Sequence, residues 1–513
     1  MSEAADVLVV GSGPAGVSCA WPLVEAGLKV KLVDPGVPAN AVALDRPSLS
    51  DVRGGLNRRF LLGDDLRALQ PASHASPKLR LGASPDFVAG YTKAHRIETE
   101  NFTLAGTLAT GGLSNVWGSV ASAFDAADLA GMPITQDDLM PSYRAVAARI
   151  GLSGTRDDDI GAFHGDVPLQ PPIEIGRRAA SLLERYRQRG SGGTGLRLGL
   201  SRNAVLSQDL GDRGACTRDA FCMWGCSRKS IYNAAHELPT LQARPNFTYA
   251  PGCIVRRIER IEGGYRVSGD AVSHTARRVV LAAGTVASTR LVLPLLGLTS
   301  RRLLNNPSYV FVLLLPGFLG RATEARDFAM AQLSYELPLQ SGYTTGLLYS
   351  ATGVSPADMA EQMPITLRGG LSMTRLLSPA LVLGLGYFDG DHSRNSIAVA
   401  ANGVKIEGGS QESLPTAMTR TRRALSRTFS RLGAVLLPGS TRLLPPGNDS
   451  HYAGTLGMGD LLSAACEVKG WDGLYVVDGA AFGRLPAKHL TFGIMANADR
   501  IGRHIAYMEQ RGG

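Results

Sequence analysis

Three cysteines lie within eleven residues of the segment GACTRDAFCMWGCSRKS: Cys216, Cys222 and Cys226. Thiols spaced so closely can ligate a metal, form a disulfide, or pack as small apolar residues. Zinc usually takes four ligands and tight cysteine pairs, and no nearby histidine completes such a set. Three thiolates could instead hold a cluster of three irons, with one cysteine for each iron. The spacing by itself leaves a three-iron cluster and simple loop packing open.

A second pattern with chemical meaning is G-x-G-x-x-G, which is formed near the N-terminus by Gly11, Gly13 and Gly16. Such glycines let the backbone approach a pyrophosphate, whose charge lies at the N-terminus of the next helix. Asp34 follows at the distance of a residue that accepts hydrogen bonds from ribose hydroxyls. The same glycine pattern recurs in residues 190–195, but there it follows polar residues and predicts only a loop.

The N-terminal glycines are placed by a complete βαβ unit. The sequence predicts a buried strand over residues 6–10, a helix that Gly27 ends, and a second strand over residues 29–33. This unit binds FAD or NAD equally well on local grounds. No second credible copy follows, which disfavours an enzyme that passes hydride from NAD(P)H to a flavin.

Composition bounds the remaining possibilities. The 513 residues, 44% of them hydrophobic and 19% charged, predict two globular domains. The net charge is +9, but its tightest cluster, residues 419–431, is typical of a solvated amphipathic helix, so we expect no nucleic-acid partner. We find no signal peptide and no apolar run of transmembrane length, and therefore expect a cytoplasmic location without a transmembrane segment. Thiols stay reduced there, which disfavours a disulfide.

Four further segments, together with the N-terminus, resemble the glucose–methanol–choline (GMC) flavoprotein oxidoreductases. They are LATGGLSNVWGSVASAF (residues 108–124), residues 132–154, VVLAAGTVASTRLVL (residues 279–293), and the C-terminal stretch that begins with HYAGTLGMG at His451. The resemblance implies an α/β fold in which a Rossmann-like FAD-binding domain with a discontinuous parallel sheet carries an inserted α+β substrate-binding domain. The expected FAD-binding pieces are residues 1–125, 211–300 (with the cysteine loop) and 450–513 (with the catalytic histidines), and the expected substrate-domain pieces are residues 126–210 and 301–449.

The resemblance also implies a set of residues around the cofactor. Beyond Gly11, Gly13, Gly16 and Asp34, the implied FAD contacts are Gly111, Gly112, Ser114, Asn115, Val116, Trp117, Ala283, Gly284, Asp478, Gly479 and Thr491. Relatives that attach FAD covalently carry a histidine where this chain has Val116, so we expect non-covalent FAD. With Trp117 at the next position, the segment resembles the sugar-oxidising branch of the family, which includes pyranose oxidase and the FAD sugar dehydrogenases.

Two histidines are expected to act on the substrate. His451 falls on the catalytic histidine of the family, and imidazole suits a general base at neutral pH. His489 falls on the family's second position, where it would hydrogen-bond the substrate oxygen. The prediction is that His451 abstracts the hydroxyl proton of a sugar-like or aminoglycoside-like alcohol while hydride passes to flavin N5, which yields a carbonyl. A redox-silent lyase of the same family and an oxidase of a non-sugar alcohol are the alternatives.

The resemblance leaves the electron acceptor open among oxygen, a quinone and a redox protein. The cysteine spacing resembles the iron–sulfur-bearing subunits of bacterial FAD-dependent sugar dehydrogenases, in which a cluster carries electrons from flavin to a cytochrome. A [3Fe-4S] cluster on Cys216, Cys222 and Cys226 is therefore one expectation, and packing of the three thiols in a loop is the other.

Overall fold

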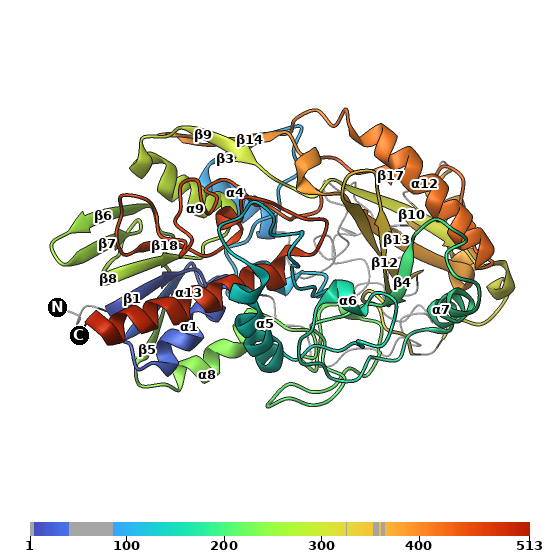
Figure 1. Cartoon of the computed structure of the whole chain (residues 1–513), viewed down its shortest axis with the longest axis horizontal. Helices are drawn as coiled ribbons and strands as arrows, with labels where there is room; N and C mark the ends of the chain where they lie inside the picture. The colour runs from blue at the N-terminus through green and yellow to red at the C-terminus, as the bar shows by residue number, and fades with distance from the viewer. Residues whose placement is uncertain (1–4, 40–85, 325, 352–358, 361–364, 513) are drawn as a thin grey trace.

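A computed structural model describes residues 5–39, 86–324, 326–351, 359–360 and 365–512. The molecule is elongated, with a mostly parallel sheet towards one end and an antiparallel sheet towards the other, and both termini lie at the parallel-sheet end (Figure 1). Among the helices in these ranges, none has the length and apolar character needed to cross a membrane.

The parallel sheet gathers pieces from three parts of the chain. Its order is β5-β2-β1-β8, with β18 also parallel to β8, and β7 and β6 continue it in antiparallel fashion. The strands are β1 (Ala5–Val10), β2 (Val30–Asp34), β5 (Phe247–Pro251), β6 (Arg257–Ile261), β7 (Gly264–Ser268), β8 (Ser273–Leu281) and β18 (Leu474–Val476). Because β1, β8 and β18 are far apart in sequence, the predicted discontinuous parallel sheet is confirmed.

The predicted βαβ unit is present at the N-terminus. Helix α1 (Pro14–Glu25) follows β1, and Gly27 takes φ +85° just beyond the helix end, a conformation that favours glycine. Helix α13 (Leu490–Gly512) packs along α1, and a Cβ at Gly502 would lie 2.5 Å from the carbonyl oxygen of Cys19. This close approach holds the C-terminal helix against the N-terminal unit.

The antiparallel sheet has the order β16-β10-β13-β12-β11-β4, and β17 pairs with β10 as well. Its strands are β4 (Arg197–Leu200), β10 (Ser308–Leu314), β11 (Leu333–Pro338), β12 (Tyr343–Ser350), β13 (Leu381–Tyr387), β16 (Val435–Leu436) and β17 (Arg442–Leu443). Helices α7 (Arg177–Arg189) and α12 (Leu414–Arg431) share an apolar core with this sheet.

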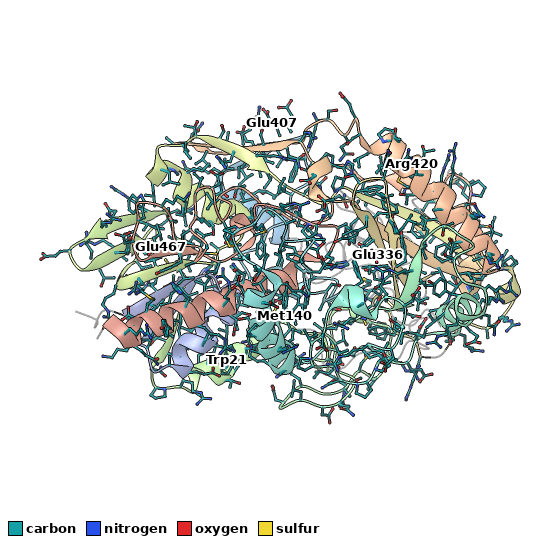
Figure 2. The ribbon with its side chains drawn as sticks, viewed as in Figure 1. Trp21, Met140, Glu336, Glu407, Arg420 and Glu467 are labelled. Atoms are coloured by element: carbon teal, nitrogen blue, oxygen red, sulfur yellow. The ribbon has the colours of Figure 1, made fainter. Side chains whose placement is uncertain are left out.

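Helix α12 accounts for the basic cluster of the sequence. It buries Leu425 and Phe429 in the core of the antiparallel sheet, while Arg420 lies on its exposed side (Figure 2). The predicted amphipathic helix is therefore confirmed. Residues 190–195, which repeat the glycine pattern, form the loop between α7 and β4, as expected.

A smaller sheet joins segments that the sequence assigned to different domain pieces. Strand β3 (Ile97–Glu100) runs parallel to β15 (Gly403–Glu407), which continues into β14 (Asn395–Ala400) and β9 (Ser300–Leu303). The other α-helices with described bounds are α4 (Asp86–His95), α5 (Gln136–Ile150), α6 (Gly161–His164), α8 (Leu238–Gln242), α9 (Thr285–Val292) and α11 (Leu367–Leu377). The exact five-piece division of domains stays a prediction.

Candidate active site

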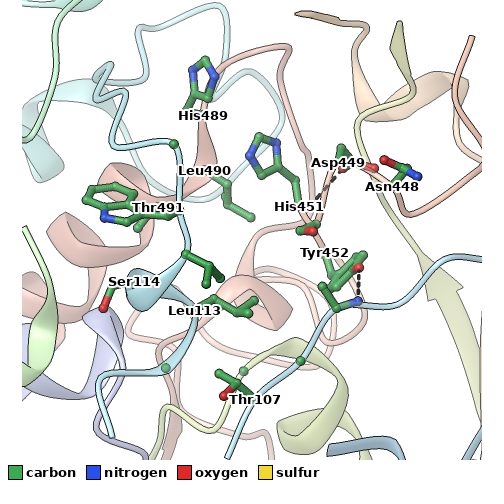
Figure 3. Close-up of a pocket in the computed structure, with 18 of the residues that line it drawn as sticks. Thr107, Leu113, Ser114, Asn448, Asp449, His451, Tyr452, His489, Leu490 and Thr491 are labelled. Atoms are coloured by element: carbon green, nitrogen blue, oxygen red, sulfur yellow. Dashed lines mark hydrogen bonds between the residues drawn. The ribbon is translucent and has the colours of Figure 1, made fainter. Parts of the chain in front are cut away.

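A cavity of about 1060 Å³ reaches from the carboxyl ends of β1 and β2 to the antiparallel sheet. It brings together most of the residues that the sequence singled out for FAD and catalysis: Gly11, Gly13, Asp34, Gly112, Ser114, Val116, Trp117, Ala283, Gly284, His451, Asp478, Gly479, His489 and Thr491. Residues from distant parts of the chain thus surround one space, and Figure 3 shows His451, His489, Ser114 and Thr491 around it.

The three glycines of the N-terminal pattern differ in what surrounds them. A Cβ at Gly11 would collide with the carbonyl oxygen of Ala282, and one at Gly16 would collide with the carbonyl oxygen of Gly11. A Cβ at Gly13 would meet only Gly112 Cα, at an ordinary 3.9 Å. The fold itself therefore requires Gly11 and Gly16, whereas Gly13 leaves open cavity space at the N-terminus of α1.

This helix terminus fits a bound pyrophosphate. Gly13 is the N-cap of α1 and offers no side-chain acceptor, so the first backbone N–H groups of the helix have no side-chain cap at this position. Such groups, together with the helix dipole, favour an anion. The open space at Gly13 and these donors together fit the diphosphate of FAD.

Asp34 and Asp478 hold the two sides of the cofactor region in place. Asp34 accepts hydrogen bonds from the backbone N–H of Ser12 (3.0 Å) and from the Tyr249 hydroxyl (3.1 Å), and the Ser12 hydroxyl also donates to it. Asp478 accepts from the backbone N–H of Gly284 at 2.9 Å, and burial raises the pKa of its carboxyl to about 6. Both carboxylates line the cavity, where ribose or ribityl hydroxyls of FAD are expected.

Gly16, Gly111 and Asn115 support the cavity from behind its lining. The backbone N–H of Gly111 donates to the Ser12 hydroxyl at 2.9 Å, which ties the glycine-rich loop to the α1 start. The Asn115 amide donates to the carbonyl oxygens of Thr110 and Gly112, at 2.9 and 2.7 Å. The sequence placed these residues at the cofactor. In the structure Gly111 and Asn115 shape the glycine-rich loop, and Gly16 lies within α1, behind Gly11.

His451 has a defined tautomer. Its Nδ1 lies 3.0 Å from Asn306 Oδ1, and the Asn306 amide nitrogen donates to two backbone carbonyls, at 2.9 and 3.0 Å. Because the amide nitrogen is committed, Asn306 presents its oxygen to the histidine, and that oxygen can only accept. The proton of His451 therefore sits on Nδ1, and Nε2 keeps a free lone pair. A ring with this tautomer can accept a proton from a substrate.

His489 lies beside His451 in the cavity (Figure 3), with ring centroids 5.7 Å apart and rings nearly perpendicular at 84°. Burial lowers the pKa of His451 to about 4, and burial together with the neighbouring His451 lowers the pKa of His489 to about 3. In the described part of the chain, His489 Nε2 is a buried nitrogen without a hydrogen-bond partner. Both rings are neutral at pH 7, and His489 has a polar atom available for a ligand.

Sequence reasoning missed three residues that position this pair. Tyr387 stacks on His451 and meets His489 edge-on, at 5.2 Å in both cases. Asp449 accepts from the backbone N–H groups of Asn306 and His451, at 2.9 and 3.1 Å, and burial raises its pKa to about 7. Asp449 could have been suspected because it stands two residues before His451. Asn306 and Tyr387 are remote in sequence and carry no local signal.

The structure does not arrange the three cysteines, all of which lie in its described part, as a three-iron site. In the described ranges, no group of three His, Cys, Asp or Glu side chains is arranged to hold a metal. Cys222 is instead buried in an apolar cluster with Phe328 and Met330, and Cys216 and Cys226 pack against that cluster. Burial raises the pKa of the Cys216 thiol to about 11, which opposes the thiolate that a cluster needs. These contacts favour loop packing, which was the other expectation, and the cluster stays a prediction. The loop places Met223 at the cavity.

Two regions of the sequence match known families. Residues 417–498 match the GMC oxidoreductase family, and residues 6–44 match the FAD binding domain. No curated protein matches the sequence. The crystal structure of pyridoxine 4-oxidase from Mesorbium loti is similar over 98% of this chain and 99% of that chain, with a TM-score of 0.62 and 17% sequence identity. The chain has the GMC oxidoreductase fold.

Both matched regions contribute residues to the lining of the cavity. The FAD binding domain match contains Gly11, Gly13 and Asp34, and the GMC oxidoreductase match contains His451 and His489. FAD is therefore the dinucleotide that the family comparison supports, which resolves the choice between FAD and NAD that the βαβ unit alone left open.

Proposed function

We propose that this protein is an FAD-dependent oxidoreductase that oxidises a hydroxyl group to a carbonyl. When bound, FAD supplies an acceptor for the hydride that leaves the alcohol carbon. The observation that supports this function best is the pair of neutral, buried imidazoles, His451 and His489, in the cavity that the α1 start also lines.

His451 is the proposed base. Asn306 keeps the proton on Nδ1, so the Nε2 lone pair is free to take the hydroxyl proton of the substrate. His489 Nε2, which has no partner within the described residues, is proposed to hydrogen-bond the substrate oxygen. Stacking on Tyr387 holds the His451 ring in the cavity and keeps water from its face.

We propose that FAD is held without a covalent bond to the protein. Val116 lines the cavity next to Trp117, and an isopropyl group has no atom that can form such a linkage. Acid precipitation should therefore release the flavin into the supernatant. The predicted division into three FAD-binding and two substrate-domain pieces is retained as part of this proposal.

The decisive test is anaerobic mixing of the FAD-loaded protein with candidate alcohols. Loss of the oxidised flavin absorbance means that hydride has been transferred, whereas persistent absorbance with a bound alcohol favours the redox-silent lyase. The panel should include sugars, because the sequence favoured them, and pyridoxine, because pyridoxine 4-oxidase shares the fold. Peroxide release measured against dye reduction then separates oxygen from other electron acceptors.

A further inference from the structure

One face of the antiparallel sheet lines the cavity with mostly aliphatic side chains. This apolar wall consists of Val310, Val312, Leu347, Leu381, Leu383 and Leu385. Side chains alternate along a strand, and the neighbouring residues Tyr309, Phe311 and Val382 pack in the core on the other face. The direction of the wall side chains is therefore set by the packing of the sheet.

The apolar wall extends away from the histidines in register. Tyr387, which stacks on His451, pairs with Ser308; Leu385 pairs with Val310, and Leu383 pairs with Val312. Leu381 lies six residues from Tyr387 along β13, which corresponds to about 20 Å at about 3.3 Å per residue. Each step of two residues thus moves the wall further from the reacting end.

Two polar side chains share this face of the sheet: Tyr349 pairs with Leu383, and Arg442 pairs with Val310. The Ser440 hydroxyl already donates to the Leu437 carbonyl at 2.7 Å and accepts from the Val312 N–H at 3.1 Å. Within the described lining, the buried side-chain N and O atoms without partners are His95 Nδ1, Ser119 Oγ, Ser308 Oγ and His489 Nε2. Ser308 pairs with Tyr387, at the histidine end of the wall.

We propose that the substrate is an alcohol with one reacting hydroxyl on an extended hydrocarbon body, which lies along the apolar wall. This inference rests on the proposed function, because the hydroxyl is the group that His451 deprotonates. A sugar would bury several hydroxyls against the aliphatic wall, and each buried hydroxyl without a hydrogen bond costs free energy. The apolar wall thus favours a lipid-like alcohol over the polyhydroxylated substrate that the sequence suggested.

The first experiment uses the FAD-loaded protein and a series of straight-chain primary alcohols from 1-butanol to 1-dodecanol, with glucose as the polar comparison. Binding is read from the saturable change in the flavin spectrum, and oxidation is read from anaerobic bleaching. We expect affinity to rise about fourfold per added methylene, which corresponds to about 0.8 kcal/mol for each buried CH₂. Glucose is expected to cause neither change.

The second experiment introduces a bulky tryptophan side chain at two positions along the apolar wall. Each variant should lower the maximum chain length of the alcohols that bind. Leu385→Trp should lower it further than Leu383→Trp, because Leu385 lies nearer the histidines. Leu376→Trp, on an α11 residue that is 64% exposed, is the matched control and should leave the chain-length profile unchanged. If a tryptophan variant does not fold, Leu383→Asn replaces it and should weaken dodecanol binding at least tenfold while butanol binding stays the same.

The outcomes separate the two proposals. Bleaching by glucose without bleaching or binding of dodecanol would overturn the apolar-alcohol inference and leave the oxidation of an alcohol standing. Binding that strengthens with chain length, without bleaching by any alcohol, would support the apolar wall and overturn oxidation. If neither Leu383→Trp nor Leu385→Trp changed the dependence of binding on chain length, the apolar wall would have no part in substrate recognition.

Discussion

The two ends of the cavity are built from different materials. At the cofactor end the lining is largely backbone: glycines and a helix N-terminus bring peptide N–H groups to the ligand, and Asp34 and Asp478 brace them. At the substrate end the lining is made of alternate side chains from strands β10, β12 and β13, which are backed by an aromatic core. A backbone-built site depends on where glycine occurs, whereas a wall of side chains depends on which face of each strand is turned inward.

Because of this difference, we expect the cofactor end to tolerate almost no substitution, whereas substitutions at the substrate end can change specificity. The diphosphate region needs free space at one α-carbon, and no other residue type provides that space. The apolar wall needs only side chains of about the right size and polarity. We expect substitutions at the cofactor end to act on cofactor content and those at the substrate end to act on specificity.

The largest expected effect is that of Gly13→Val, which should abolish FAD retention. The added Cβ would meet Gly112 Cα at 3.9 Å, so the fold tolerates it, but the branched side chain would occupy the pyrophosphate space. Flavin absorbance per protein after purification measures the effect. Gly317→Val is the control, because a Cβ there meets nothing within 4 Å. A yellow Gly13→Val protein would contradict the assignment of the cofactor end.

His451→Ala should lower the rate of flavin reduction by about 10²- to 10⁴-fold while bound FAD remains. The substitution removes the Nε2 lone pair but touches neither α1 nor its glycines. Stopped-flow absorbance with a reducing alcohol measures the rate, and His504→Ala on α13, outside the cavity lining, is the matched control.

His489→Asn should lower the rate of flavin reduction less than His451→Ala does, because asparagine can still donate a hydrogen bond. A larger loss there than at His451 would mean that the two roles are reversed.

The pH dependence of flavin reduction should follow the buried histidine rather than a free one. The neutral ring is the active base, and burial disfavours its charged form, so the pKa of His451 falls from 6.5 to about 4. The active form therefore persists on the acid side, and the rate should stay level down to about pH 5 before it falls about tenfold per pH unit below pH 4. A midpoint near 6.5 would show that His451 is hydrated in the working enzyme.

Gly384→Val should destabilise the substrate end without loss of cofactor affinity. A Cβ at Gly384 would collide with the Phe311 ring on the back of the wall, and overpacking of this kind typically costs about 1–3 kcal/mol. Urea unfolding gives the change in free energy, and flavin content provides the comparison. If Gly384→Val instead released FAD at unchanged stability, the two ends could not be regarded as independent.

The smallest expected effect is that of Cys222→Ser. Its thiol lies in an apolar cluster, so a hydroxyl there should cost about 1 kcal/mol of stability and leave FAD content and the reduction rate unchanged. Iron analysis of the unaltered protein, produced with ample iron and sulfide, completes the test. About three irons per chain, lost in Cys222→Ser, would restore the cluster that the structure argues against.

The sequence alone determined the features that depend on local chemistry. The cofactor role could be predicted for Gly11, Gly13, Gly16 and Asp34 because a turn, a helix start and a strand end lie within one short stretch of chain. His451 and His489 could be nominated because each stands in a recognisable C-terminal segment. The α/β class and the discontinuous parallel sheet were implied by the resemblance of these segments to the GMC oxidoreductases.

Only the tertiary structure decided what depends on several distant segments at once. Asn306 sets the tautomer of His451 across 145 positions of the chain, and a lone asparagine has no periodicity that would reveal this. The cysteine spacing left a cluster and loop packing open, and the structure favours packing because Cys222 is buried among Phe328 and Met330. The apolar wall exists because three strands turn the same face to the cavity, and strand pairing, which is a long-range property, sets that face.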